Sequence, residues 1–415
     1  MGPFVASRRV MGTGKRSSMG LAGRDFALLI AATLGTFSNY APLLSVVSLW
    51  VAGGGSGHGG VGAATGVTMA TTVGVQLVMG PLLRRYELRR LLAVGALLLG
   101  APTFAYPFSS GLEWVLGVSA VRGVGFGMVA VAGSALVAEL VPAHQRGRAV
   151  GRYGIAVGLP QVVCLPVGVW SAQRFGFTAI FVVTGALSVL AAPLAGLMSG
   201  RVEEDTPDRG RSSARADSSH PVAGLRPLSG PWVMLIVAAC AVGGVTAFLP
   251  LALEGGAAAP TALFMLSAAV IVGRWAAGVF SDRAGAGRLL VPGVLACTLG
   301  TAGFALAISG LPGLAWAAAV LYGLGFGALQ NDTLVVMFHR VGRSGHGMAS
   351  TAWNMAYDAG TGVGAVAVGM VSQVLGVGGG FAAAAVLIAL VSPLAWRERR
   401  AEATRRGTPA LAHES

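Results

Sequence analysis

Residues 278–290 read Gly-Val-Phe-Ser-Asp-Arg-Ala-Gly-Ala-Gly-Arg-Leu-Leu, a short charged, glycine-rich segment between two long apolar runs. Residues 80–92 read Gly-Pro-Leu-Leu-Arg-Arg-Tyr-Glu-Leu-Arg-Arg-Leu-Leu, and they share the first glycine, the arginine at the sixth place and the last leucine. The two segments begin 198 residues apart, which is about half of the 415-residue chain. This spacing indicates equivalent loops in two copies of one unit.

The same offset recurs further along the chain. Gly-x-Gly-Phe-Gly stands at 123–127 and again at 323–327, 200 residues later. Other identities at this offset are Gly147 and Gly347, Ala149 and Ala349, Gly176 and Gly376, Phe181 and Phe381, and Pro-Leu-Ala at 193–195 and 393–395. Identities at a nearly constant offset predict a duplicated unit, and two parallel halves are one of the known transporter architectures.

Composition places the chain in a membrane. Hydrophobic residues make up 54% and charged residues 11%, against roughly 25% charged in a soluble domain. The backbone in lipid must satisfy its own hydrogen bonds, and the chain lacks the alternating segments of a β-barrel. Since about 20 helical residues span the hydrocarbon core, we predict an all-α integral membrane fold with twelve transmembrane helices, six per half, at 26–51, 61–83, 91–109, 114–140, 149–171, 177–200, 231–252, 260–280, 289–309, 313–337, 348–372 and 379–396.

Basic residues predict the orientation. Of 29 Lys and Arg residues, only Arg174 falls on one side, Arg122 and Arg274 fall inside helices, and the rest fall on the other side. Loops enriched in Lys and Arg stay in the cytoplasm, so we expect a multi-pass plasma-membrane protein with both termini cytoplasmic. This topology, with anionic lipid, accounts for the net charge of +13 without a nucleic-acid partner. The expected parts are a basic tail (1–25), a first half (26–200), a linker (201–230), a second half (231–396) and a tail (397–415).

Several polar residues fall inside the predicted helices. A buried Arg122 or Arg274 should face a cavity or a carboxylate, unless it reaches the membrane interface. The amide of Asn39 fits either an interhelical hydrogen bond or a substrate contact. Asp332 and Asp358 are candidate proton carriers, because carboxylates in a low-dielectric site suit proton loading and release near neutral pH. The rival interpretation of Asp358 is a structural ion pair with Arg274.

A central cavity follows from the distribution of these groups. The third helix of each three-helix unit has no charged residue in its core, as expected for lipid-facing helices. Trp353 and Tyr357 share a helix face by their four-residue spacing, and Asn354 and Asp358 share the neighbouring one. The candidate cavity residues are Asn39, Tyr40, Arg122, Gln161, Arg274, Gln330, Asn331, Trp353, Asn354 and Tyr357.

The chain resembles the major facilitator superfamily over nearly its whole length. That family's loop motif, Gly-x-Leu-x-Asp-Arg-x-Gly-Arg-Arg-x-x-Leu, is matched by Gly278, Asp282, Arg283, Gly285, Arg288 and Leu290. The copy at 80–92 departs from it, with Arg84 in place of the Asp and Glu87 in place of the Gly. The resemblance implies cytoplasmic gate loops that include Gly80, Arg84, Arg85, Gly278, Asp282, Arg283 and Arg288.

Two further motifs of that family appear in modified form. Arg122 and the glycines after it resemble the basic motif of the fourth helix, with tighter spacing. Gly154, Gly158 and Pro160 resemble the Gly-x-x-x-Gly-Pro antiporter motif of the fifth helix only loosely. The resemblance therefore supports the twelve-helix fold more strongly than antiport.

Enzymatic chemistry is not indicated. The six His have no metal-ligand spacing, the three Cys fall in predicted helices, and no phosphate-binding loop or nucleophile motif is present, so we expect no enzyme activity, metal or cofactor. We expect a monomeric secondary transporter that works by alternating access and exports an amphipathic small molecule or drug in exchange for protons. The alternatives are proton-coupled uptake of a small metabolite or organic anion, and a non-transporting membrane sensor or scaffold.

Overall fold

The computed structural model describes residues 20–199, 227–253, 257–342 and 345–407, and these residues form helices and short connections without a β-strand. The predicted linker at 201–230 and the N-terminal tail at 1–25 therefore lie largely outside the described residues, whereas 397–407 of the predicted C-terminal tail are described and helical. The first half contains α1 (Arg24–Gly53), α2 (His58–Arg85), α3 (Leu88–Gly100), the 3-10 helix η1 (Ala101–Phe108), α4 (Leu112–Leu140), the 3-10 turn η2 (Ala143–Gln145), α5 (Arg146–Phe175) and α6 (Phe177–Gly196). The second half contains α8 (Ser229–Ala252), α9 (Ala258–Ala284), α10 (Leu290–Ile308), α11 (Leu314–Val341), α12 (His346–Ala389) and α13 (Ser392–Gly407).

The structure repeats itself at the offset seen in the sequence. Gly176, between α5 and α6, has φ 86° and ψ 160°, and Gly376, inside α12, has φ 70° and ψ 171°. Both conformations lie in the positive-φ region that glycine adopts without steric cost. Gly376 therefore divides α12 into two helical arms, 346–375 and 377–389, as Gly176 divides α5 from α6.

Close helix contacts repeat in the same way. A Cβ atom at Gly123 of α4 would overlap the carbonyl oxygen of Thr68 in α2. A Cβ atom at Gly323 of α11 would lie 2.6 Å from the carbonyl oxygen of Leu266 in α9. The glycines are 200 residues apart and the carbonyl groups 198 apart, so the two halves share one packing arrangement. Small residues at such crossings let the helix backbones approach closely.

Ten helices in the described part of the chain are long and apolar enough to cross a membrane. Two elements account for the difference between these ten helices and the twelve that the sequence predicts. α11 has 28 residues but is not one of the ten, and the two arms of α12 count there as part of one long helix. The last predicted helix, 379–396, differs from the structure, in which the second arm of α12 ends at Ala389 and α13 begins at Ser392.

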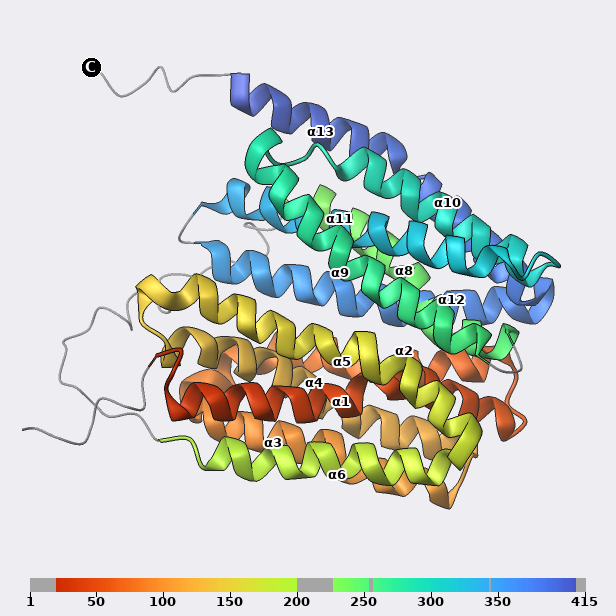
Figure 1. The fold of residues 1–415 in the computed structure, drawn as a ribbon, viewed down its shortest axis with the longest axis horizontal. Helices are drawn as coiled ribbons and strands as arrows, with labels where there is room; N and C mark the ends of the chain where they lie inside the picture. The colour runs from red at the N-terminus through yellow and green to blue at the C-terminus, as the bar shows by residue number, and fades with distance from the viewer. Residues whose placement is uncertain (1–19, 200–226, 254–256, 343–344, 408–415) are drawn as a thin grey trace, which may run out of the picture.

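The two halves lie side by side with their helices running roughly parallel or antiparallel (Figure 1). α1 begins and α13 ends at the same end of the bundle, which we call the terminal face. The opposite end, where α1 is followed by α2, is called the distal face. The buried apolar side chains form two clusters, one within the first half and one that spans both halves, and α2, α5 and α9 also line the boundary between the halves.

α13 is docked on the second half at the terminal face, and it packs on α10 and α8. Arg340, in the last turn of α11, forms ion pairs with Glu398 and Glu402 of α13, the second at 2.9 Å. The same guanidinium donates a hydrogen bond of 2.8 Å to the carbonyl oxygen of Pro227. One arginine thus connects α11, α13 and the segment that leads into α8.

Candidate functional site

The halves meet chiefly through three helix pairs, which are α1 with α8, α2 with α12, and α5 with α9. Close contacts lie toward the distal face. A Cβ atom at Gly62 of α2 would overlap the carbonyl oxygen of Ala365 in α12. The hydroxyl of Ser45 in α1 donates a hydrogen bond of 2.6 Å to the carbonyl oxygen of Thr246 in α8. The distal face is therefore closed in this structure.

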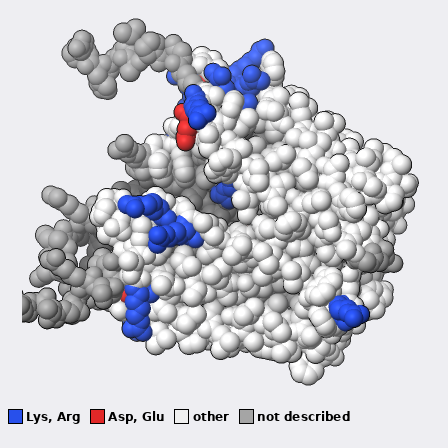
Figure 2. Space-filling view, viewed as in Figure 1, with Lys and Arg blue, Asp and Glu red and all other residues white. Residues whose placement is uncertain are grey.

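The same helices are less crowded toward the terminal face. Apart from the adjacent residues and the helix's own backbone, no described atom lies within 4 Å of a Cβ position at Gly74 or Gly80 of α2, or at Gly151 or Gly154 of α5. Figure 2 shows a hollow between the two halves near this end, with a basic side chain in it, and other Lys and Arg side chains gathered around the terminal face. The space between the halves therefore opens toward the terminal face.

Asp358 of α12 lies at the boundary between the halves. Its carboxylate accepts a hydrogen bond of 2.7 Å from the side-chain amide of Gln76 in α2, and only 5% of the residue is exposed. The amide oxygen of Gln76 is buried and has no hydrogen-bond partner among the described residues. Arg274 forms no ion pair with Asp358 in this part of the chain, so the ion pair considered from the sequence is absent there.

Arg274 of α9 remains exposed although it stands within the helix bundle. Its guanidinium carbon lies 5.3 Å from the ring centre of Trp353, a cation–π contact. The indole N–H of Trp353 donates a hydrogen bond of 3.1 Å to the carbonyl oxygen of Gln330, and the rings of Trp353 and Tyr357 stack at 6.3 Å. The guanidinium is thus held by aromatic surface, and no carboxylate pairs with it among the described residues.

Arg122 of α4 does not reach the membrane interface, because only 3% of it is exposed. Its guanidinium donates hydrogen bonds of 3.0 Å to the amide oxygen of Asn39 and 3.1 Å to the hydroxyl of Tyr106. The amide of Asn39 in turn donates to the hydroxyl of Thr103 at 3.2 Å. Asn39 therefore makes the interhelical hydrogen bonds that were one of its two predicted roles. The Nε of Arg122 has no partner among the described residues.

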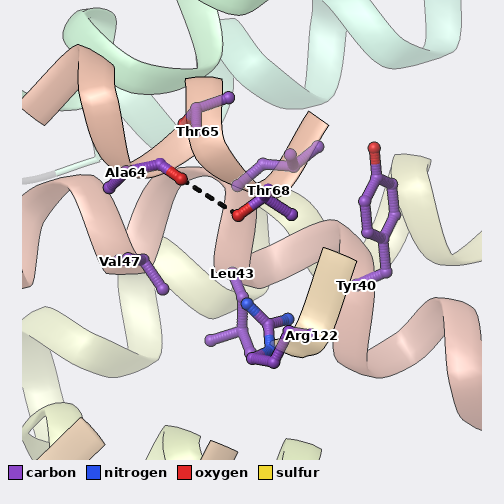
Figure 3. A pocket seen from close by; sticks show the side chains of 8 residues that line it. Tyr40, Leu43, Val47, Ala64, Thr65, Thr68 and Arg122 are labelled. Atoms are coloured by element: carbon purple, nitrogen blue, oxygen red, sulfur yellow. Dashed lines mark hydrogen bonds between the residues drawn. The ribbon is translucent and has the colours of Figure 1, made fainter. Parts of the chain in front are cut away.

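Arg122 and Tyr40 line a small pocket between α1, α2 and α4 (Figure 3). The ring of Tyr40 stacks on Phe126 with 3.6 Å between ring centres and an interplanar angle of 2°. The cavity volume is about 10 Å³, which is close to the space of one water molecule. This pocket is therefore too small for a substrate in the conformation shown.

Asp332 lies apart from Asp358, against the loop that follows α9. Its carboxylate accepts hydrogen bonds of 2.8 Å from the backbone N–H of Gly287 and 2.8 Å from that of Leu289. The hydroxyl of Ser281 lies 3.4 Å from the same carboxylate. These contacts fix the loop at 285–289. Within this loop, Gly285 and Gly287 have positive φ angles of 90° and 84°.

The first copy of the loop is held differently. Glu87 forms ion pairs with Arg89 at 2.7 Å and with Arg90 at 3.3 Å. The hydrogen bond from Arg89 holds the pKa of the exposed Glu87 carboxyl below its usual range. Arg89 also donates to the carbonyl oxygen of Met198 at 2.8 Å, which connects this loop to the end of α6. Glu87, one of the two departures from the family motif, is thus the centre of the local charge contacts.

The remaining predicted residues are spread over both halves. Among the loop residues, Gly80, Arg84, Arg85, Asp282, Arg283 and Arg288 are exposed, and Gly278 is half-buried. Asn354 is exposed and donates to the carbonyl oxygen of Ser350 at 2.9 Å. Asn331 has a buried amide nitrogen without a partner in the described part, and Gln161 is half-buried. The structure thus brings together Arg274, Trp353 and Tyr357 around one space, beside Asp358.

Sequence reasoning missed Gln76. It stands in the second predicted helix as a lone amide, and the carboxylate that it contacts lies 282 residues away. The internal repeat contains a signal that points to it, because residue 76 is 198 positions before Arg274. Two polar side chains at equivalent positions of α2 and α9 indicate that both helices face the same space.

Comparison with known proteins identifies the family. A model of the Major Facilitator Superfamily matches residues 26–365, which is most of the chain. The chain belongs to the Major Facilitator Superfamily. It is therefore a multi-pass membrane transporter and not an enzyme. No curated protein matches the chain.

Solved structures of other Major Facilitator proteins have the same fold at low identity. A bacterial homologue of the human lysosomal transporter Spinster, in an inward-facing and unoccupied conformation, is 14% identical with a TM-score of 0.77, over 93% of this chain and 98% of that one. A D-xylose–proton symporter is 15% identical with a TM-score of 0.73, over 90% and 97%. A nucleoside transporter, NupG, is 11% identical with a TM-score of 0.69, over 91% and 98%. Identities this low show the shared fold only, so the substrate has to be inferred from the site itself.

Proposed function

We propose that this Major Facilitator protein is a proton-coupled secondary transporter in which Asp358 carries the proton. The observation that carries the proposal is the hydrogen bond of 2.7 Å between Gln76 and Asp358, which joins α2 of one half to α12 of the other. Asp358 is buried, and no cation pairs with it among the described residues. Within that part of the chain neither lysine nor arginine balances its charge, so binding a proton changes the charge at the boundary directly.

The coupling step follows from the chemistry of this bond. An ionised Asp358 accepts a charge-assisted hydrogen bond from the amide of Gln76, which helps to hold the two helices together. A protonated Asp358 is neutral and loses the charge-assisted part of that bond. It gains a donor, for which the unpartnered amide oxygen of Gln76 is a suitable acceptor after rotation of the amide. Proton binding thus changes the strength of a contact between the moving halves.

The second carboxylate fits a different task. Asp332 accepts two backbone hydrogen bonds from the loop at 285–289, so both of its carboxylate oxygens are engaged in holding that loop. The partners in these bonds all belong to the second half. We therefore propose Asp332 as an anchor for the loop and not as the proton carrier.

For the cargo we propose export of an amphipathic small molecule. Support comes from Trp353 and Tyr357, whose stacked rings lie beside an accessible cation, and from the opening toward the terminal face. If the terminal face is cytoplasmic, as the basic residues indicate, the structure is open on the side from which an exporter loads its substrate. We propose the plasma membrane as its location.

A second candidate is proton-coupled uptake of a small organic anion. It is favoured by one observation, which is that neither Arg122 nor Arg274 forms an ion pair within the described part of the chain. Such cations attract an anionic substrate from either face of the membrane. The opening toward the terminal face then corresponds to the side of substrate release.

Everted membrane vesicles test the coupling. Vesicles that contain the protein are energised to an acidic interior, and apolar drugs and small organic acids are added in turn. We expect one compound to dissipate the gradient with the wild type and with Asp332→Asn, and to have no effect with Asp358→Asn. Loss of the response in Asp332→Asn alone would make Asp332 the carrier. No response to any compound in the wild type would contradict export by proton exchange and favour uptake, which accumulation of the labelled acids in whole cells then measures.

A further inference from the structure

The internal repeat gives each cross-half contact an equivalent on the other side of the protein. Arg274 of α9 follows Gln76 of α2 by 198 residues, the offset that also separates the two loop motifs. Asp358 of α12 follows Gly158 of α5 by 200 residues, the offset between Gly176 and Gly376. Since α2 packs on α12 and α5 packs on α9, these two helix pairs are equivalent boundaries between the halves.

The two boundaries differ in what fills them. Between α2 and α12, Gln76 meets the carboxylate of Asp358 at 2.7 Å. Between α5 and α9, Arg274 stands where Gln76 stands in the first boundary, and Gly158 stands where Asp358 does. A Cβ atom at Gly158 would have one neighbour within 4 Å among the described residues, the Cδ1 of Ile271 at 3.5 Å. Ile271 and Arg274 share a helix face by their three-residue spacing. The carboxylate of the first boundary is therefore missing beside the arginine of the second.

We propose that an anionic group of the substrate takes the place of this missing carboxylate, so that the cargo is an amphipathic organic acid bound by Arg274. The proposal rests on the transport function proposed above. It deepens that function by giving each boundary one ligand, a proton at Gln76 and Asp358 and the acid at Arg274.

The surroundings of Arg274 suit this ligand. A guanidinium presents donors in a planar arrangement that binds a carboxylate through two parallel hydrogen bonds. Contact with Trp353 at 5.3 Å limits the orientation of the guanidinium, and the indole is itself held by the carbonyl oxygen of Gln330. The ring of Tyr357 stacks on Trp353 at 6.3 Å and lies 6.0 Å from Phe326. The acid group can thus bind Arg274, and the apolar part of the ligand can pack against the rings of Trp353 and Tyr357.

Arg122 is the less suitable of the two cations. Its guanidinium already donates to Asn39 and Tyr106, and the pocket beside it has a volume of only about 10 Å³. Arg274 is exposed, makes no hydrogen bond or ion pair within the described residues, and lies over the ring of Trp353. Its donors are therefore available to an acid group of a ligand.

Ligand binding to the purified protein in detergent tests the proposal without a proton gradient. The probes are four acids (benzoate, 3-phenylpropionate, 2-naphthoate and decanoate) and their uncharged amides, with affinity taken from the thermal shift at increasing concentration. Arg274→Gln removes the cation and installs the residue that α2 carries at the equivalent position. Gly158→Asp supplies the missing carboxylate from the protein, and Gly158→Asn is its matched uncharged control.

We expect at least one acid to stabilise the wild type and its amide not to. Affinity for that acid should fall about tenfold or more in Arg274→Gln and in Gly158→Asp, and it should fall less in Gly158→Asn, which fills the same space without a charge. Binding is measured without a proton gradient, so a failure of proton coupling alone leaves this result intact. Equal binding of acid and amide, unchanged binding in Arg274→Gln, or no binding of any of the four acids would overturn the proposal. If Gly158→Asp does not fold, Arg274→Gln and Arg274→Lys decide, with Lys retaining part of the affinity.

Discussion

The side chains of Gln76 and Asp358, 282 residues apart in sequence, meet across the two halves in a hydrogen bond of 2.7 Å. The bond lies nearer the terminal face than the close contact of Gly62 with Ala365, which seals the distal side. This contact, which includes the titratable Asp358, thus lies at the end of the closed boundary that is nearer the terminal face. At this position the charge of Asp358 affects whether α2 and α12 separate.

Replacing Gln76 by Leu should weaken the distal closure. A hydrogen bond to a charged group contributes about 1.5–3 kcal/mol, so its loss corresponds to a shift of roughly ten- to a hundredfold between closed and open states. Spin labels at Gly57 and Gln373, which lie together at the distal end, measure the change in a variant without Cys164, Cys240 and Cys297. We expect a longer-distance population to grow. Gln161→Leu, which removes an amide of α5, is the control that should leave the distances unchanged.

Gly62→Val should hold the distal face open. A Cβ atom there would overlap the carbonyl oxygen of Ala365, so a valine must push α12 away from α2. The matched control is Gly74→Val on the same helix, where no described atom other than the helix's own backbone and the adjacent residues lies within 4 Å of the Cβ position. Labelling of a cysteine placed at Thr65 by a membrane-impermeant maleimide, added from each side, reports the accessibility. Equal labelling of both variants from the distal side would contradict the packing described here.

Asp332→Ala should reduce stability and not proton coupling. The substitution leaves the N–H groups of Gly287 and Leu289 without their acceptor, at a cost of about 1–3 kcal/mol for each buried donor. Asp332→Asn keeps one acceptor oxygen and should lose less. The melting temperature in detergent and the gradient response in vesicles separate the two effects. Wild-type melting of Asp332→Ala would show that the loop does not depend on this carboxylate.

Arg340→Met should release α13. The substitution leaves Glu398 and Glu402 without their cation, and breaking a buried ion pair in this way costs about 3–5 kcal/mol. Limited proteolysis should then cleave α13 faster than in the wild type. Adding Glu398→Gln and Glu402→Gln to Arg340→Met removes the unpaired charges and should recover part of the protection. If the triple variant is cleaved as fast as Arg340→Met, the ion pairs are not what holds α13.

Local patterns in the sequence predict much of this protein. The hydropathy of the apolar runs gives the helices, since a segment in lipid must satisfy its backbone hydrogen bonds within itself. The constant offset gives the duplication, and Gly176 and Gly376 take equivalent backbone conformations because glycine meets no steric penalty at positive φ. The last helix boundary was wrong, because a run of apolar residues does not show the break between Ala389 and Ser392.

The amino-acid sequence by itself determined the class of fold, the internal repeat and the set of polar residues that lie inside helices. Which of those residues meet was decided by tertiary structure alone. Helix periodicity relates residues three or four positions apart, so it cannot pair Asp358 with Gln76, Arg340 with α13, or Asp332 with a loop 43 residues before it. The last two pairings depend on how helices pack within the second half, and the first depends on how the two halves are oriented toward one another. That orientation follows from the close packing of small residues across the helix crossings, such as Gly62 against Ala365, which no single segment contains.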